Sequence, residues 1–113
     1  MTYKRIVVSR RGGPEVLQVV EEELPEPKKG EVRVRVLAAG VGFADILFRE
    51  GLFPGGPKVP FTPGFDIVGT VDKTGEEVST SKMGQPVAVL TVTGGYAEYV
   101  CVPASDLVSV PPR

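Results

Sequence analysis

The sequence predicts a mainly β protein, a barrel or a sandwich, and three observations support this. Short apolar or alternating segments follow one another at regular spacing, and glycine and proline separate them; 14 of the 113 residues are glycine and 11 are proline. Between residues 32 and 36, valine alternates with arginine, which is the period of a strand with one buried and one wet face. Only one segment, 44–50, has a helical pattern. Many short strands with turn signals between them are typical of barrels and sandwiches.

Two strands are expected before residue 24. The first, 3–9, ends at the glycines and proline of 10–14, which favour a turn. The second, 16–23, ends where Pro25 and Pro27 interrupt backbone pairing.

A third strand and the only helix follow a polar turn at 28–31. The alternating strand 32–36 continues into residues 37–40, where both faces become apolar. A helix of about two turns is expected at 44–50, with Asp45 in its first turn and Gly51 as its stop.

A proline-rich loop follows the helix. Four prolines within ten residues cannot donate backbone N–H groups, so the loop is neither a helix nor a central strand; they are Pro54, Pro57, Pro60 and Pro63. Phe53 and Phe61 favour an ordered loop, because aromatic side chains fold back onto apolar surface. Together with the helix and an apolar strand at 66–72, the loop is expected to form one wall of a cleft.

The last part of the chain is expected to hold three further strands. Residues 73–85 are polar and contain glycine, which predicts a surface connection. Strands are then expected at 86–92, 96–102 and 106–110, with a glycine turn at 93–95.

Composition and charge narrow the function classes. The net charge is −1, and no long run of like charge supports a nucleic-acid or membrane-surface partner. Cys101 is the only cysteine, which excludes an internal disulfide, and no apolar run approaches the ~18 residues of a membrane span. No signal segment opens the chain, so a cytoplasmic location is expected.

Several motifs resemble one enzyme family. The segments 40–54 (GVGFADILFREGLFP) and 59–71 (VPFTPGFDIVGTV) resemble the catalytic-domain core of the medium-chain dehydrogenase/reductase superfamily, closest to its zinc-free quinone oxidoreductase-like branch. Segments 13–17, 84–90 and 94–100 agree in order and spacing. The resemblance implies that residues 1–113 are one alcohol dehydrogenase-type, GroES-like catalytic domain, a partly open β-barrel with short helices. It also implies a nucleotide-binding domain after Arg113 as partner.

The resemblance implies no zinc. The zinc enzymes of the superfamily place a cysteine ligand at the position of Gly42 and a histidine ligand at that of Phe65, and neither residue can bind metal. Zinc prefers about four nitrogen, sulfur or oxygen ligands, and a single distant Cys101 in a chain without histidine cannot supply them.

A substrate pocket is expected around the helix. In the resembled branch, an Asn and a Tyr face the nicotinamide from the positions of Gly42 and Leu47, and a further Tyr matches Phe53. Without these polar groups, a pocket lined by Phe43, Leu47, Phe53 and Phe65 would suit a bulky or planar carbonyl compound. The alternative is that these are ordinary core residues.

Two carboxylates and the glycine pairs complete the candidates. Asp45 and Asp66 could form a general acid/base pair, or Asp45 could cap the helix while Asp66 ties down the strand entry.

The glycine pairs at 12–13, 55–56 and 94–95 lack the G-x-G-x-x-G spacing, so this chain is expected to bind no NADPH. The sequence indicates no catalytic residue, and Cys101 is expected to be a small buried hydrophobe.

Two functions remain open. The chain could be the substrate-side domain of a zinc-independent, NAD(P)H-dependent oxidoreductase of quinones or other conjugated carbonyls, inactive when isolated. In such an enzyme the cofactor carries the hydride chemistry and the protein supplies orientation and a dry pocket. Alternatively, it could be a free-standing GroES-like binding module without catalytic activity.

Overall fold

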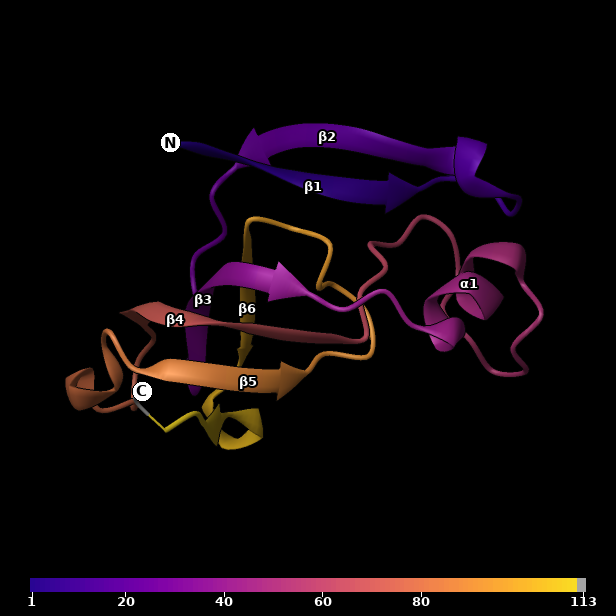
Figure 1. Cartoon of the computed structure of the whole chain (residues 1–113). Helices are drawn as coiled ribbons and strands as arrows, with labels where there is room; N and C mark the ends of the chain where they lie inside the picture. The colour runs from indigo at the N-terminus through magenta and orange to yellow at the C-terminus, as the bar shows by residue number, and fades with distance from the viewer. Residues whose placement is uncertain (112–113) are drawn as a thin grey trace.

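The computed structural model describes residues 1–111 as two antiparallel sheets that do not close into a complete barrel (Figure 1). A two-stranded hairpin consists of β1 (Thr2–Val8) and β2 (Leu17–Glu23). The five-stranded sheet has the order β6–β3–β4–β5–β7. Its strands are β3 (Glu31–Ala39), β4 (Asp66–Thr74), β5 (Pro86–Leu90), β6 (Tyr99–Pro103) and β7 (Val108–Ser109). The helices are α1 (Phe43–Glu50) and three single 3₁₀ turns, η1 (Pro14–Val16), η2 (Thr80–Lys82) and η3 (Ala104–Asp106).

The predicted mainly β, GroES-like fold is confirmed, and the differences lie at strand ends. The strand expected at 96–102 begins only at Tyr99, because Tyr96 and Glu98 donate their backbone N–H groups to Pro63 and Lys4 instead of entering the sheet (2.8 and 3.0 Å). The strand expected at 86–92 ends at Leu90, and the last one shrinks to two residues.

Two apolar clusters form the core. The larger cluster belongs to the five-stranded sheet and consists of β-branched residues, whose stiff side chains suit a pleated surface. It contains Val32, Val34, Ile67, Val71, Val87, Val89 and Val102. The second cluster lies where the hairpin meets α1 and the proline loop, and contains Val8, Val16, Phe48 and Phe61. Phe61 thus confirms that the loop folds back onto apolar surface.

Backbone hydrogen bonds from two loops hold the hairpin in place. Val8 N–H donates to the Phe61 carbonyl in the proline loop (2.8 Å). Ile6 N–H donates to the Tyr96 carbonyl in the β5–β6 connection (2.8 Å). The hairpin is therefore joined by backbone hydrogen bonds to the two loops that flank the five-stranded sheet.

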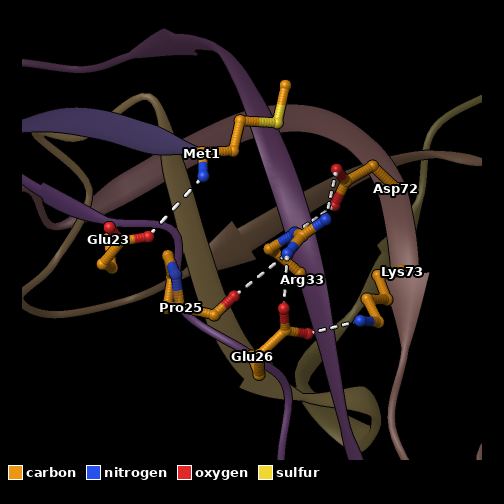
Figure 2. Close-up of polar contacts among 7 residues, drawn as sticks. All are labelled: Met1, Glu23, Pro25, Glu26, Arg33, Asp72 and Lys73. Atoms are coloured by element: carbon orange, nitrogen blue, oxygen red, sulfur yellow. Dashed lines mark hydrogen bonds and ion pairs between the residues drawn. The ribbon is translucent and has the colours of Figure 1, made fainter.

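Arg33 is an exception to the expected wet face of the alternating strand, on which Arg35 is exposed. Arg33 is only 8% exposed, because the linker between β2 and β3 crosses over it. The guanidinium donates from Nε and Nη2 to the two carboxylate oxygens of Asp72 (2.8 and 3.1 Å) and from Nη1 to the Pro25 carbonyl (3.1 Å) (Figure 2). Glu26 lies between Arg33 and Lys73. The hydrogen bonds to Asp72 raise the pKa of Arg33 further above its usual value.

Candidate substrate-side site

Asp45 is the centre of the polar contacts at the start of α1. Asp45 is 3% exposed, and its carboxylate Oδ2 accepts the N–H of Gly42, the N-cap residue, at 2.9 Å. Its Oδ1 accepts the N–H of Gly64 in the proline loop at 3.2 Å, and Tyr96 Oη donates to Oδ2 at 3.3 Å. One carboxylate therefore joins the helix, the proline loop and the β5–β6 connection. This confirms the interpretation that Asp45 caps the helix.

Asp66 has a different environment from Asp45. It is exposed at the start of β4, its carboxylate lies against Gly40, and its backbone carbonyl accepts the Gly40 N–H at 3.1 Å. The hydrogen bonds of Asp45 go to backbone amides and Tyr96, so the two carboxylates do not share a proton through a direct bond. An acid/base role for the pair has no support in this geometry.

Tyr96 is the polar residue of the site that sequence reasoning missed. Burial, together with the negative charge of Asp45, raises the pKa of its phenol to about 12. Tyr96 also borders a cavity of about 140 Å³, lined by Leu17, Val41, Asp45, Ile46, Arg49, Pro63 and Tyr96. The Gly-Gly-Tyr motif at 94–96 is visible in the sequence, but no local pattern connects Tyr96 to Asp45, which lies 51 residues earlier.

The apolar candidates lie at different depths. Phe43 is 74% exposed, and Phe53 is 45% exposed with its ring edge-on to that of Phe48 (5.1 Å between centroids). Leu47 is half-buried, and Phe65 packs against the second core cluster. Phe43 and Phe53 are open to solvent, so a shared pocket of the four side chains stays a prediction.

The β5–β6 connection contains a strained turn next to Phe65. Val92 has φ +65°, a left-handed conformation that is rare for a β-branched residue. Its N–H donates to the Phe65 carbonyl (3.0 Å), and the next N–H, from Thr93, donates to the Thr91 carbonyl (2.7 Å), which forms a γ-turn. Such strain is concentrated at functional sites. No sequence signal marks Val92, because valine usually favours negative φ.

The described residues hold few groups for metal or thiol chemistry. Within residues 1–111 no three His, Cys, Asp or Glu side chains gather as a metal site, and Gly42 and Phe65 carry no ligand atom. The absence of zinc stays a prediction. Cys101 is half-buried, and burial raises the pKa of its thiol to about 11, as suits a packing residue. Among the described helices, none has the length and apolarity needed to cross a bilayer.

The fold and the helix–loop frame are those of an alcohol dehydrogenase GroES-like domain. The family model "Alcohol dehydrogenase GroES-like domain" matches residues 28–112, and the chain belongs to this family. It is 42% identical over 98 residues to quinone oxidoreductase from Lama guanicoe, covering 85% of this chain and 30% of that protein.

Solved structures show the same relationship. The structure of human synaptic vesicle membrane protein VAT-1 homolog-like protein matches 98% of this chain with 32% identity and a TM-score of 0.91. Escherichia coli quinone oxidoreductase complexed with NADPH matches 96% with 34% identity and a TM-score of 0.87. The chain spans about a third of the length of these relatives.

Proposed function

We propose that this chain is the substrate-side domain of a zinc-independent, NADPH-dependent oxidoreductase that reduces quinones or other conjugated carbonyls. A nucleotide-binding domain following residue 113 would hold the cofactor. The observation that carries the proposal is the hydrogen-bonded frame around Asp45, with no ligand atoms at Gly42 and Phe65, in a chain that is 34% identical to an NADPH-complexed quinone oxidoreductase.

The residues of this chain would position the substrate. NADPH, when bound in the longer protein, supplies the hydride. Asp45 and Tyr96 hold the start of α1 against the proline loop, which fixes the backbone from which Phe43 and Phe65 project. These apolar side chains would exclude water and orient a planar carbonyl compound. The glycine pairs at 12–13, 55–56 and 94–95 lack the G-x-G-x-x-G spacing, so the cofactor would be held mainly elsewhere.

A binding module without activity is the second candidate. The observation in its favour is the exposure of large apolar side chains beside α1, namely Val41, Phe43 and Leu52. Exposed apolar surface is a feature of partner-binding sites as well as of open substrate walls. In that case the same surface would bind a partner and NADPH would have no role.

The test is a chimera in which residues 1–113 replace the matched third of E. coli quinone oxidoreductase. The folded chimera is expected to oxidise NADPH with a quinone, whereas residues 1–113 alone are expected neither to bind NADPH nor to turn over. Replacing Phe43 by Ser should raise KM for the quinone, and Met83→Ser, an exposed change in the 73–85 connection, should leave it unchanged.

Two outcomes would contradict the proposal. A chimera that folds and binds NADPH but reduces no quinone or enone would favour the binding module. Micromolar NADPH binding by residues 1–113 alone would reveal a cofactor site within this chain.

A further inference from the structure

The loop between α1 and β4 is held by one side chain from the hairpin. Residues 53–60 bond to each other through Gly56 N–H and the Phe53 carbonyl (3.0 Å), and three of these residues are proline, which has no N–H to donate. Within residues 1–111, this stretch makes one hydrogen bond to another segment: Arg11 Nη2 donates to the Pro57 carbonyl at 2.6 Å. The position of residues 53–60 therefore depends on Arg11.

The same guanidinium binds the end of α1. Arg11 Nη1 donates to the Phe48 carbonyl at 2.6 Å. The last carbonyls of a helix have no partner within the helix and carry the negative end of its dipole, so a cation is favourable there. The guanidinium also lies over the Phe61 ring, 5.8 Å from its centroid. Two donors of one planar group thus bridge the helix and the loop, which a lysine ammonium cannot do with the same geometry.

The backbone of Arg11 is held beside α1. Gly12 N–H donates to the Arg49 carbonyl (3.2 Å), and Arg49 Nε donates back to the Gly12 carbonyl (3.1 Å). In Figure 1 the turn between β1 and β2 lies at the same end of the molecule as α1. Gly51, which ends the helix with φ +76°, leaves room for the arginine, because a Cβ there would lie 3.1 Å from Arg11 Cδ. Arg11 therefore reaches the loop from a fixed turn, across a position that a glycine keeps open.

Phe53 is the candidate pocket residue that this loop carries. It is 45% exposed, and its ring meets that of Phe48 edge-on, with 5.1 Å between the centroids. Arg11 donates to the Phe48 carbonyl before Phe53 and to the Pro57 carbonyl after it. An aromatic ring without a polar group orients a ligand through the placement of its face and edge, so the position of the loop decides what Phe53 can contact.

We propose that Arg11 is a positioning residue for the substrate: it holds the loop so that Phe53 extends the apolar wall, and thereby sets how well larger planar carbonyl compounds bind. The inference rests on the proposed function, because it takes the surface beside α1 as the substrate wall. A single-ring quinone needs little of this wall, whereas a three-ring quinone extends further along it. Because NADPH supplies the hydride, loosening the loop weakens substrate binding and leaves the chemical step unchanged.

Kinetics of the chimera with E. coli quinone oxidoreductase test this role. Arg11→Ala is expected to raise KM for phenanthrenequinone about tenfold, the size of effect that a hydrogen bond from a charged group has. KM for benzoquinone and for NADPH, and kcat with each quinone, are expected to change by less than about twofold. Arg11→Lys, which keeps the charge but not the planar group, should fall between the unchanged chimera and Arg11→Ala. Arg10→Ala removes an equal charge from the exposed neighbouring residue, which makes none of these contacts, and should have no effect.

Hydrogen exchange in the same chimeras reports on the loop without turnover. The Gly56 amide is expected to exchange about tenfold faster in Arg11→Ala than in the unchanged chimera, because opening of the loop exposes it. The Val71 amide, in the buried part of β4, should exchange at the same rate in both, which shows that the fold is intact.

The outcomes separate this inference from the proposed function. A folded, active Arg11→Ala chimera with unchanged Gly56 exchange, or with equal KM changes for the two quinones, would overturn the inference alone. Equal effects of Arg10→Ala and Arg11→Ala would also overturn it, since charge and not the bridge would then act. Faster Gly56 exchange in Arg11→Ala, with no quinone reduction by the unchanged chimera, would support the bridge and contradict the proposed function.

Discussion

At the scale of single residues, the contacts of Asp45 explain why a carboxylate is buried beside α1 without a cation from residues 1–111 in direct contact. Two backbone N–H groups and one phenol satisfy its oxygens, and hydrogen bonds to a charged acceptor are stronger than neutral ones. Because these donors come from three separate segments, the carboxylate acts as a positioning group for the whole site. Tyr96 contributes the only side-chain donor among them.

The raised pKa of Tyr96 predicts an alkaline loss of stability. The folded protein favours the neutral phenol, so this contribution is complete below pH 10 and is lost as the pH rises towards 12. Chemical denaturation between pH 9 and 12 should show that the free energy of unfolding falls more steeply with pH in the protein with Tyr96 than in the Tyr96→Phe variant. Both are measured in a Cys101→Ala background, because the thiol pKa of about 11 overlaps this window. Parallel pH profiles would contradict the assignment.

The strain at Val92 predicts a stabilising substitution. Glycine adopts the positive φ of a γ-turn without the steric cost that valine has, so Val92→Gly is expected to increase the free energy of unfolding by about 1 kcal/mol. Val68→Gly, at an exposed position of β4, should be destabilising because glycine is disfavoured in strands. Urea denaturation measures both. A destabilised Val92→Gly would show that the valine side chain makes contacts that outweigh the strain.

At the scale of elements, β3 and β4 are the centre of the larger sheet and are joined on one face by charge. Arg33 and Asp72 lie on neighbouring strands and form a bidentate ion pair, while the Pro25 carbonyl and Glu26 tie the preceding linker to the same guanidinium (Figure 2). Removing Asp72 would leave the mostly buried guanidinium of Arg33 with only the Pro25 carbonyl and the exposed Glu26 as partners, which compensates its charge poorly. The pair thus fixes how the linker from the hairpin enters the sheet.

Replacing Asp72 by Ala is therefore expected to be strongly destabilising. The free energy of unfolding should fall by about 2–3 kcal/mol. This is somewhat less than for a fully buried pair, because the Asp72 side chain is 28% exposed. Glu23→Ala, which removes an exposed ion pair with the amino terminus, should change stability by less than about 0.5 kcal/mol. Thermal or urea denaturation compares them, and similar values for the two variants would refute a structural role of the Arg33 cluster.

At the scale of the whole molecule, the two sheets depend on loops for their relative position. The proline loop and the β5–β6 connection bond to the hairpin, to each other and to Asp45, so the site and the junction of the sheets share the same residues. Changes that loosen this junction should therefore affect stability and substrate positioning together.

The whole chain is also expected to fold without metal. Residues 1–113 should give a mainly β circular dichroism spectrum and one cooperative thermal transition, because the two apolar clusters lie within the domain. Elemental analysis of protein purified without chelator should find zinc well below one equivalent. A stoichiometric zinc that resists chelation would show that Gly42 and Phe65 do not occupy the ligand positions.

The sequence by itself determined the approximate positions of the strands, the α-helix and the missing ligand atoms at Gly42 and Phe65, because periodicity, turn residues and side-chain chemistry are local properties. It left Asp45 open between a helix cap and an acid/base role, and the structure decided for the cap. Only the tertiary structure showed that Arg33 is buried, that Tyr96 reaches Asp45 and that Val92 is strained. Each of these depends on a loop or linker from elsewhere in the chain. The hydrogen bond from Arg11 to the Pro57 carbonyl likewise joins segments 46 residues apart, which no local pattern specifies.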